Sequence, residues 1–247
     1  MTISTNPSSP PANLAQNRRG GRLVEIDALR GVAALAVVLF HYTTRFTELF
    51  TAASPPTLSF PDGHYGVNLF FIISGFVIFM TLEKTSKPMD FVVSRFSRLF
   101  PAYWVAIILT FLLTHLLGLP GMLVDLGTAL GNLIMIHGLF FIAHVDGVYW
   151  TLEVELLFYC GMLGLFWLKQ LDRIHYFLLG LLLVRLTYFV LASEFGVELS
   201  WMLSRLLILN YIPWFALGIS IHALASRQGQ RKSWRAPVLT ASCAILT

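Results

Sequence analysis

Charged residues are scarce in this sequence, and cysteine is nearly absent. Only 12% of the 247 residues are Asp, Glu, Lys or Arg, whereas about a quarter are charged in ordinary soluble domains. Hydrophobic residues make up 56%, and the mean hydropathy is +0.72. These values exclude a soluble globular domain and indicate an integral membrane protein. Cys160 and Cys243 both lie in apolar runs without CxxC spacing, so neither a disulfide framework nor a zinc site is expected.

The basic residues fall in short clusters between apolar segments, so the net charge of +4 indicates membrane orientation rather than nucleic-acid binding. Residues 1–22 are rich in Pro, Ser and Asn and predict a disordered basic tail, whereas 23–247 form the membrane domain. By the positive-inside rule the N-terminus and every cluster should be cytoplasmic. The clusters are Arg18, Arg19 and Arg22; Lys84, Lys87, Arg95 and Arg98; Lys169 and Arg173; and Arg227, Arg231, Lys232 and Arg235.

Long apolar segments predict an all-α, polytopic transmembrane helical bundle, because most could cross a hydrocarbon core of about 30 Å as helices. A first span is expected in the run 31–40. The further segments are 66–82, 99–118, 123–144, 148–168, 174–192 and 202–224.

Seven full crossings would separate the basic clusters onto opposite sides of the membrane. One segment must therefore not cross, and 123–144 is the best candidate, because it contains Asp125, Asn132, His137 and several glycines. His137 and His144 would share a helical face, but two histidines alone are more often structural than ligands, and we expect no metal site. The last apolar stretch, 236–247, is too short to span, which indicates an incomplete last helix or a fragment of a longer protein.

The stretch from Asp27 to His41 places three ionisable groups on one side of an apolar helix. Arg30 and His41 are separated by about 20° around a helix axis, and Asp27 lies within about 40° of His41. Charge inside a bilayer is costly, so these residues are candidates for a functional site. The alternative is an Arg that snorkels to the headgroups and a His that forms a hydrogen bond in the bundle core.

Three further stretches carry candidate chemistry. Ser74 and Gly75 interrupt an aromatic run, which could reflect helix packing alone. Arg95 and Arg98 project to one side before Pro101, which suits the first turn of the next span; this pair could bind phosphate or simply anchor the membrane boundary. In the fourth stretch Thr151, Glu155 and Tyr159 recur on one helical face, whereas Glu153 points elsewhere.

In this order the motifs resemble those of the acyltransferase-3 family of membrane O-acyltransferases. Arg30 and His41 match its Arg, ten residues, His pattern, and 66–76 resembles its GVxLFFxxSGF signature, with Asn68 where Asp is common. Its RxxR element before a Pro resembles Arg95, Arg98 and Pro101. The WSLxxE element that ends in FY resembles Trp150 to Tyr159, with Thr151 in place of Ser. The segment 211–221 is similar to a short aromatic element of the family. Members usually have some three more spans.

The resemblance implies transfer of an acyl group, most often acetyl, from acyl-CoA to a sugar hydroxyl of a surface or exported carbohydrate. It implies a multi-pass protein of the bacterial inner membrane, with acyl-CoA as a substrate and no permanently bound cofactor. His41 would be the general base, with Arg30 and Glu155 as the other catalytic residues and Arg95 and Arg98 holding coenzyme A phosphates. The expected supporting residues are Asp27, Ser74, Trp150, Thr151 and Tyr159.

Two other interpretations remain open. A transporter could place Asp27, Arg30, His41 and Glu155 along a proton or solute path, although it would not account for the Arg pair beside Pro101. The other interpretation is that the chain is a truncated, inactive member of the family. If the enzyme interpretation is right, one polar cavity open to the cytoplasm should be lined by six residues: Asp27, Arg30, His41, Arg95, Arg98 and Glu155.

Overall fold

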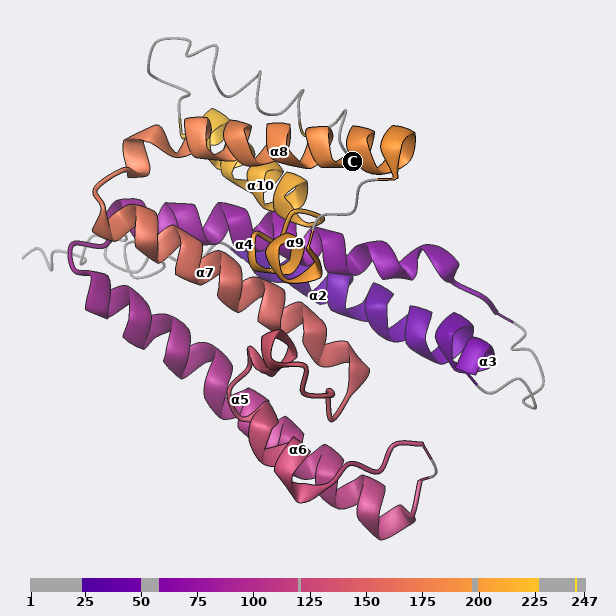
Figure 1. Ribbon diagram of the computed structural model, residues 1–247. Coiled ribbons are helices and arrows are strands. Elements are labelled where there is room, and N and C mark those ends of the chain that lie inside the picture. Colours follow the sequence, from indigo (N-terminus) through magenta and orange to yellow (C-terminus); the bar gives the residue numbers. More distant parts are fainter. Residues whose placement is uncertain (1–23, 50–57, 120, 197–199, 227–242, 244–247) are drawn as a thin grey trace, which may run out of the picture.

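The structure is a computed structural model that describes residues 24–49, 58–119, 121–196, 200–226 and 243. These residues form helices and connecting turns, with no strand among them, which confirms the all-α prediction (Figure 1). The expected tail 1–22, the basic cluster 227–235 and most of the last apolar stretch lie outside the described residues. The α-helices are α2 (Val24–Phe40), α3 (Phe46–Leu49), α4 (Tyr65–Lys84), α5 (Pro88–Leu117), α6 (Leu126–Asn132), α7 (Trp150–Trp167), α8 (Ile174–Phe195), α9 (Trp201–Leu206) and α10 (Ile212–Ala225).

Within the described part of the chain, four helical stretches are long and apolar enough to cross a membrane: Pro61–Lys84, Pro88–Leu117, Gly147–Trp167 and Leu171–Phe195. The expected first span lies in α2, which has 17 residues and continues through a π-helical turn (His41–Arg45) into α3. In α5 and in α8, only 17% of the most apolar 18-residue segment of the helix is buried inside the protein. Such apolar outer faces suit contact with lipid, so the chain is an integral membrane protein.

Helix α4 is the centre of the bundle and packs against α10, α2 and α7. Its contact with α10 is very close, because a methyl group at Gly75 would overlap the carbonyl oxygen of Phe215, and one at Gly218 would overlap that of Ile72. Gly66 makes a similar approach to the carbonyl oxygen of Ala33 on α2. Small residues therefore let three helices approach through their backbones.

The expected span 99–118 begins eleven residues earlier than predicted. Lys87 is extended and Pro88 opens α5 at its first turn, where a proline loses no helical hydrogen bond. The prediction that Pro101 lies in a first turn was therefore wrong, since Pro101 lies inside α5. As a result Arg95 and Arg98 are on a helix rather than in a loop.

The segment 123–144 does not form a membrane-spanning helix, as predicted. It contains the short helix α6 and a single 3-10 turn, His137–Phe140. Asn132 is fully buried and links distant parts of this segment by hydrogen bonds. Its side-chain NH2 group donates to the carbonyl oxygens of Thr128 and Ala143, and its side-chain oxygen accepts from the backbone amide of Val145. These bonds satisfy backbone groups that a broken helix leaves without partners.

The expected span 202–224 is not one helix, and this prediction was wrong. Helix α9 ends at Leu206, and a turn with Ile208 in the left-handed region (φ 45°) separates it from α10. Pro213 in the first turn of α10 cannot donate a backbone hydrogen bond, which favours a helix start there.

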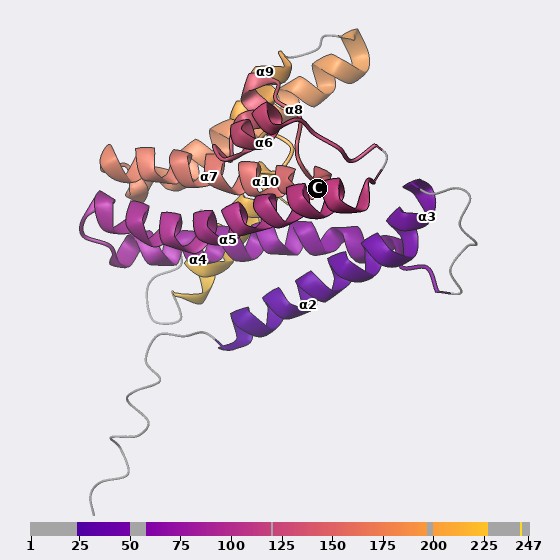
Figure 2. The ribbon, with the colours of Figure 1, turned by 90° about the horizontal axis from the view of Figure 1, so that it is seen from below.

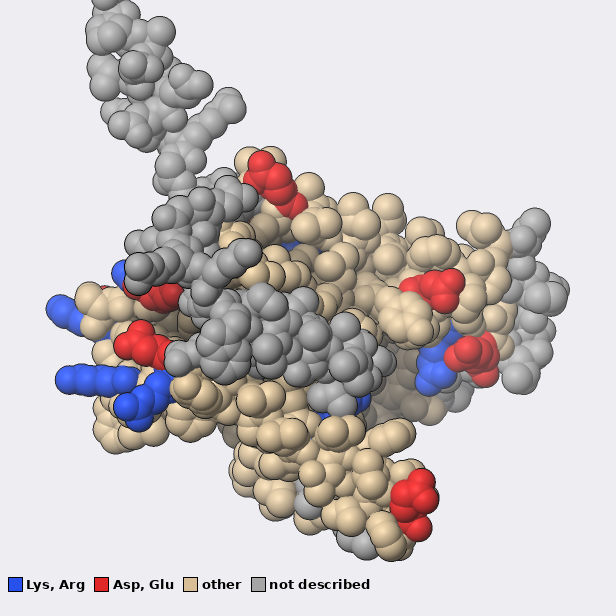
Figure 3. All heavy atoms as spheres, turned by 90° about the horizontal axis from the view of Figure 1, so that it is seen from above, with Lys and Arg blue, Asp and Glu red and all other residues tan. Residues whose placement is uncertain are grey.

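The turn between α4 and α5 lies at the same end of the bundle as the turn between α7 and α8 (Figure 1). These turns carry Lys84 and Lys87, and Lys169 and Arg173. Helix α2 begins closer to that end than α3, which lies at the opposite one (Figure 2). Lys and Arg side chains gather at this end on the face seen in Figure 3. Placing this end in the cytoplasm stays a prediction.

Candidate functional site

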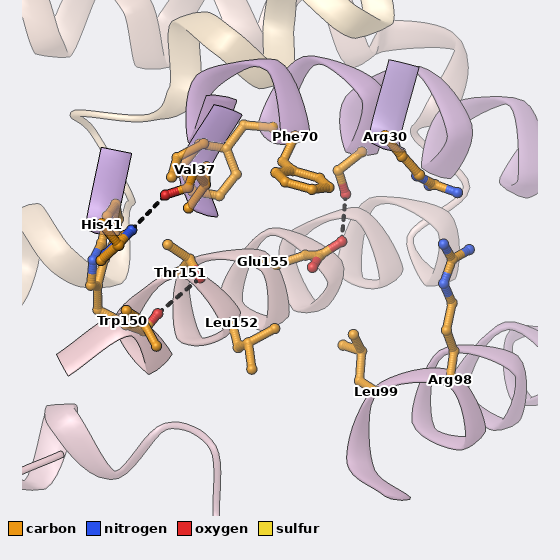
Figure 4. Close-up of a pocket in the computed structure, with 14 residues that line it drawn as sticks. Arg30, Val37, His41, Phe70, Arg98, Leu99, Trp150, Thr151, Leu152 and Glu155 are labelled. Atoms are coloured by element: carbon orange, nitrogen blue, oxygen red, sulfur yellow. Dashed lines mark hydrogen bonds between the residues drawn. The ribbon is translucent and has the colours of Figure 1, made fainter. Parts of the chain in front are cut away.

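A cavity of about 360 Å³ lies between α2, α4, α5 and α7 (Figure 4). Apolar side chains such as Val37, Phe70 and Leu99 make up much of its wall. The sequence-predicted residues that line it are Arg30, His41, Ser74, Arg98, Trp150, Thr151 and Glu155. The expectation that six named residues converge on one cavity is therefore met for Arg30, His41, Arg98 and Glu155, and it is wrong for Asp27 and Arg95.

His41 lies where α2 gives way to the π-helical turn, a distortion often found at functional sites. Its Nδ1 lies 2.8 Å from the carbonyl oxygen of Val37. Because a carbonyl oxygen can only accept, Nδ1 donates the hydrogen bond, and in the neutral ring Nε2 is left as an acceptor. In the neutral form of this half-buried imidazole at the cavity wall, Nε2 is thus the nitrogen that can receive a proton.

Glu155 is held by two hydroxyl groups. Its Oε1 accepts a hydrogen bond of 2.9 Å from the Ser74 hydroxyl and another from the Tyr159 hydroxyl. The predicted supporting roles of Ser74 and Tyr159 thus have a geometric basis. Ser74 and Gly75 have different roles. Ser74 orients the Glu155 carboxylate, and Gly75 allows the close approach of α10.

The guanidinium groups of Arg30 and Arg98 extend toward each other on one side of Glu155, whereas His41 lies at the other end of the cavity beside Trp150 (Figure 4). Asp27 does not line the cavity, but its carboxylate lies 3.7 Å from the Arg30 guanidinium, so it acts through Arg30. Two like charges facing each other near a single carboxylate favour the binding of an anion between them.

Arg95 does not join Arg98, so the prediction of a two-arginine fork was wrong. Its buried guanidinium lies over the Phe91 and Tyr159 rings, 5.5 and 5.9 Å from their centroids, and makes a 3.5 Å contact with the Thr81 hydroxyl. Residues three apart on a helix differ by about 60° in direction, so packing of α5 turns Arg95 into the bundle and leaves Arg98 at the cavity.

Trp150 and Thr151 both line the cavity, at the start of α7. The Thr151 hydroxyl donates to the carbonyl oxygen of Val148 at 3.2 Å, which closes the first turn of the helix. Trp150 lies between Phe71 and Tyr211, with ring centroids 6.3 and 5.1 Å away. This aromatic contact sets the shape of the His41 end.

A second polar cluster was missed by sequence reasoning. Fully buried Glu153 accepts two 2.9 Å hydrogen bonds from Arg205, one from Nε and one from Nη2. Gly138 packs against this pair, since a methyl group there would overlap both side chains. An arginine inside the apolar segment 202–224 was the available signal, because a charge in such a segment needs a partner.

His137 and His144, outside the membrane-spanning segments, hydrogen-bond to each other through Nε2 and Nδ1 at 2.7 Å. Burial, together with the neighbouring His144, lowers the pKa of His137 to about 4, so the pair is uncharged at neutral pH. Among the described residues, no group of three His, Cys, Asp or Glu side chains is arranged to hold a metal ion.

A family model for the acyltransferase domain matches residues 23–247. The chain belongs to the acyltransferase-3 family. It is 35% identical over 113 residues to Protein 2 in picA locus of Rhizobium radiobacter, a match that covers 42% of this chain and 54% of that protein. It is 32% identical over 125 residues to the exopolysaccharide production protein ExoZ of Rhizobium meliloti (strain 1021), covering 47% of this chain and 38% of ExoZ. The matches thus span about half or less of these relatives, and no solved structure matches.

Proposed function

We propose that this protein is a membrane O-acyltransferase. It transfers an acyl group, which we expect to be acetyl, from acyl-CoA to a hydroxyl of an exported or cell-surface carbohydrate. One observation carries the proposal: His41, whose Nδ1 is bound to a backbone carbonyl so that Nε2 remains as an acceptor, lines the same cavity as Arg30 and Arg98. Membership of the acyltransferase-3 family and likeness to a protein named for exopolysaccharide production support it.

The proposed reaction uses His41 as a general base. Its Nε2 takes the proton of the acceptor hydroxyl while the hydroxyl oxygen attacks the thioester carbonyl carbon. A new C–O bond forms, the C–S bond then breaks, and the coenzyme A thiolate receives the proton from the imidazolium. The bond from Nδ1 to the Val37 carbonyl orients the ring and stabilises the charge that it carries between these steps.

The arginines bind the donor in this scheme. Arg30 and His41 are eleven residues apart, which corresponds to about 16 Å along a helix. The extended pantetheine arm of coenzyme A can bridge this separation, with its phosphates at Arg30 and Arg98 and its thioester near His41. Glu155, held by Ser74 and Tyr159, balances the two positive charges.

We further propose that the protein resides in a bacterial inner membrane with its N-terminus and the turn 85–87 in the cytoplasm. Cysteine-accessibility labelling tests this orientation with Lys87→Cys, in a variant whose two native cysteines are replaced. The label should react from the cytoplasmic face, and reaction only from the external face would reverse the topology.

The decisive test of the reaction is coenzyme A release by the purified full chain with an oligosaccharide acceptor. His41→Ala should lower turnover by roughly 10²–10⁴-fold, because the imidazole is needed in the transition state. The chain offers a matched control: the Nδ1 of His115 also bonds a carbonyl four residues back, that of Phe111 at 2.8 Å, but His115 does not line the cavity. His115→Ala should retain turnover, and undiminished transfer by His41→Ala would remove His41 from the mechanism.

A further inference from the structure

A second cavity of about 240 Å³ lies beside α7, α9 and the turn that follows α9. It combines aromatic and polar side chains: Trp150, Trp201 and Tyr211 with Ser204, Arg205 and Asn210. Trp150 also lines the His41 cavity, so the two spaces share this residue in their walls. No step of the reaction proposed above uses this second cavity.

Arg205 presents fixed hydrogen-bond donors to this space. Its Nε and Nη2 are bound to Glu153, and its guanidinium lies over the Trp201 ring at 5.1 Å from the centroid. These contacts use only two of the five N–H groups of a guanidinium, so the others can donate to a ligand. Because Glu153 cancels the charge of Arg205, the cavity has no net charge to attract an anion.

Aromatic side chains supply apolar surface to this cavity. Trp201 is 44% exposed and stacks on Phe141 with ring centroids 5.0 Å apart, and the rings of Trp150 and Tyr211 lie 5.1 Å apart. A sugar ring offers apolar C–H faces and a rim of hydroxyl groups, which matches aromatic faces combined with a few fixed polar groups. The volume is below the range of about 300–1,000 Å³ that takes drug-sized ligands, so it suits one ring.

We propose that this cavity is a carbohydrate-binding subsite that holds one neutral sugar ring of the acceptor. The exposed surface of Trp201 and the Tyr211 side chain contact the apolar C–H groups of the sugar, and Arg205 with Asn210 binds its hydroxyl groups. The neighbouring ring of the same chain then reaches His41 past Trp150. This subsite rests on the proposed function for its role in transfer, although sugar binding can be measured without turnover.

The test titrates methyl glucoside and methyl galactoside into the purified full chain by calorimetry, beside acceptor KM measured from coenzyme A release. Trp201→Ala should weaken binding of the sugar that binds wild type by about tenfold, since truncating a well-packed aromatic contact is costly. Trp201→Phe should restore much of the loss. Trp167→Ala is the control, because Trp167 is 73% exposed at the far end of α7, and its affinity should be unchanged.

A second variant guards against loss of folding by Trp201→Ala. Asn210 is exposed in a turn, and Asn210→Ala should weaken sugar binding several-fold while leaving the KM for acyl-CoA unchanged. If wild type binds neither sugar, or if affinity and acceptor KM are unchanged in Asn210→Ala and in folded Trp201→Ala, the subsite is wrong even where transfer proceeds. If sugar binding depends on Trp201 but no transfer occurs, the subsite stands and the proposed function fails.

Discussion

Glu153 and Glu155 lie two residues apart on α7, yet the protein uses them in opposite ways. Glu153 is fully buried and paired through two hydrogen bonds with Arg205. Glu155 lines the His41 cavity and accepts hydrogen bonds from the neutral hydroxyls of Ser74 and Tyr159. The difference follows from helix geometry, because residues two apart point about 200° apart around the axis. One face of α7 holds the fold together, and the other faces the proposed site.

Partners rather than residue type therefore decide what each carboxylate does. A buried ion pair adds little stability relative to an apolar pair but is costly to break. A carboxylate that is held only by hydroxyls can balance a charge that arrives with a substrate. Variants of the two faces should consequently separate stability from activity.

The largest effect is expected for Glu153→Ala, which leaves the Arg205 charge without its partner. Removing one member of a buried pair costs about 3–5 kcal/mol, and the partial exposure of Arg205 favours the lower end. Denaturant unfolding in detergent measures the loss. The control is Glu48→Ala, which breaks the exposed pair with Arg45 (2.8 Å) and should cost under about 1 kcal/mol. Equal losses in both variants would contradict the comparison.

Acid should lower the free energy of unfolding, because His137, which lies close to the Glu153–Arg205 pair, becomes protonated more readily in the unfolded chain. The pKa of His137 is about 4 in the folded chain, below the unfolded value of 6.5, so protons bind preferentially to the unfolded state below pH 6.5. Stability is thus retained above pH 6.5 and lost as the pH falls toward 4, by roughly 2 kcal/mol at pH 5. Glu153, Arg205 and His144 are the charged or titratable neighbours.

The measurement compares unfolding of wild type and His137→Gln between pH 7 and 5, where the glutamine cannot be protonated. The unfolding free energy of wild type minus that of His137→Gln should fall as the pH falls, by roughly 2 kcal/mol between pH 7 and 5. A difference that stays constant with pH would show that His137 does not titrate in this range.

Much of this arrangement could be predicted from the sequence. Hydropathy predicted α4, α7 and α8, because long apolar runs determine which helices can lie in lipid. The ordered motifs predicted Arg30, His41 and Glu155 as site residues, and the cavity brings them together.

Partners distant in the sequence were harder to predict. The Glu153–Arg205 pair joins residues 52 positions apart. The turn at Ile208 that places Arg205 in the bundle lies inside an apolar run, and Pro213, which marks the start of α10, does not show which residue upstream pairs with Arg205. The outward or inward direction of Arg95 depended on where α5 begins and on which helices pack against it.

Glu155→Gln should separate activity from stability on the cavity face. Glutamine keeps the shape and can still accept from Ser74 and Tyr159, but it no longer balances the charges of Arg30 and Arg98. We expect turnover to fall by roughly 10–100-fold, as for other residues that act by orienting and tuning a site, with little change in unfolding. Coenzyme A release measures the first, and thermal unfolding the second. A variant that unfolds readily while its folded fraction keeps full activity would place Glu155 with Glu153 as a structural group.

The smallest effect concerns the same division on α5, between Arg95 and Arg98. If Arg98 binds donor phosphates, Arg98→Ala should raise the KM for acyl-CoA by about tenfold with little change in kcat, because the lost interaction is made equally in ground and transition states. Arg95 lies over the Phe91 and Tyr159 rings, so Arg95→Ala should lower stability through lost packing and leave the KM of the folded protein unchanged. Arg95→Met, which keeps an apolar stem in the same space, should recover part of that stability. Steady-state kinetics with varied acyl-CoA decides between them, and a KM that rises in Arg95→Met but not in Arg98→Ala would reverse the assignment.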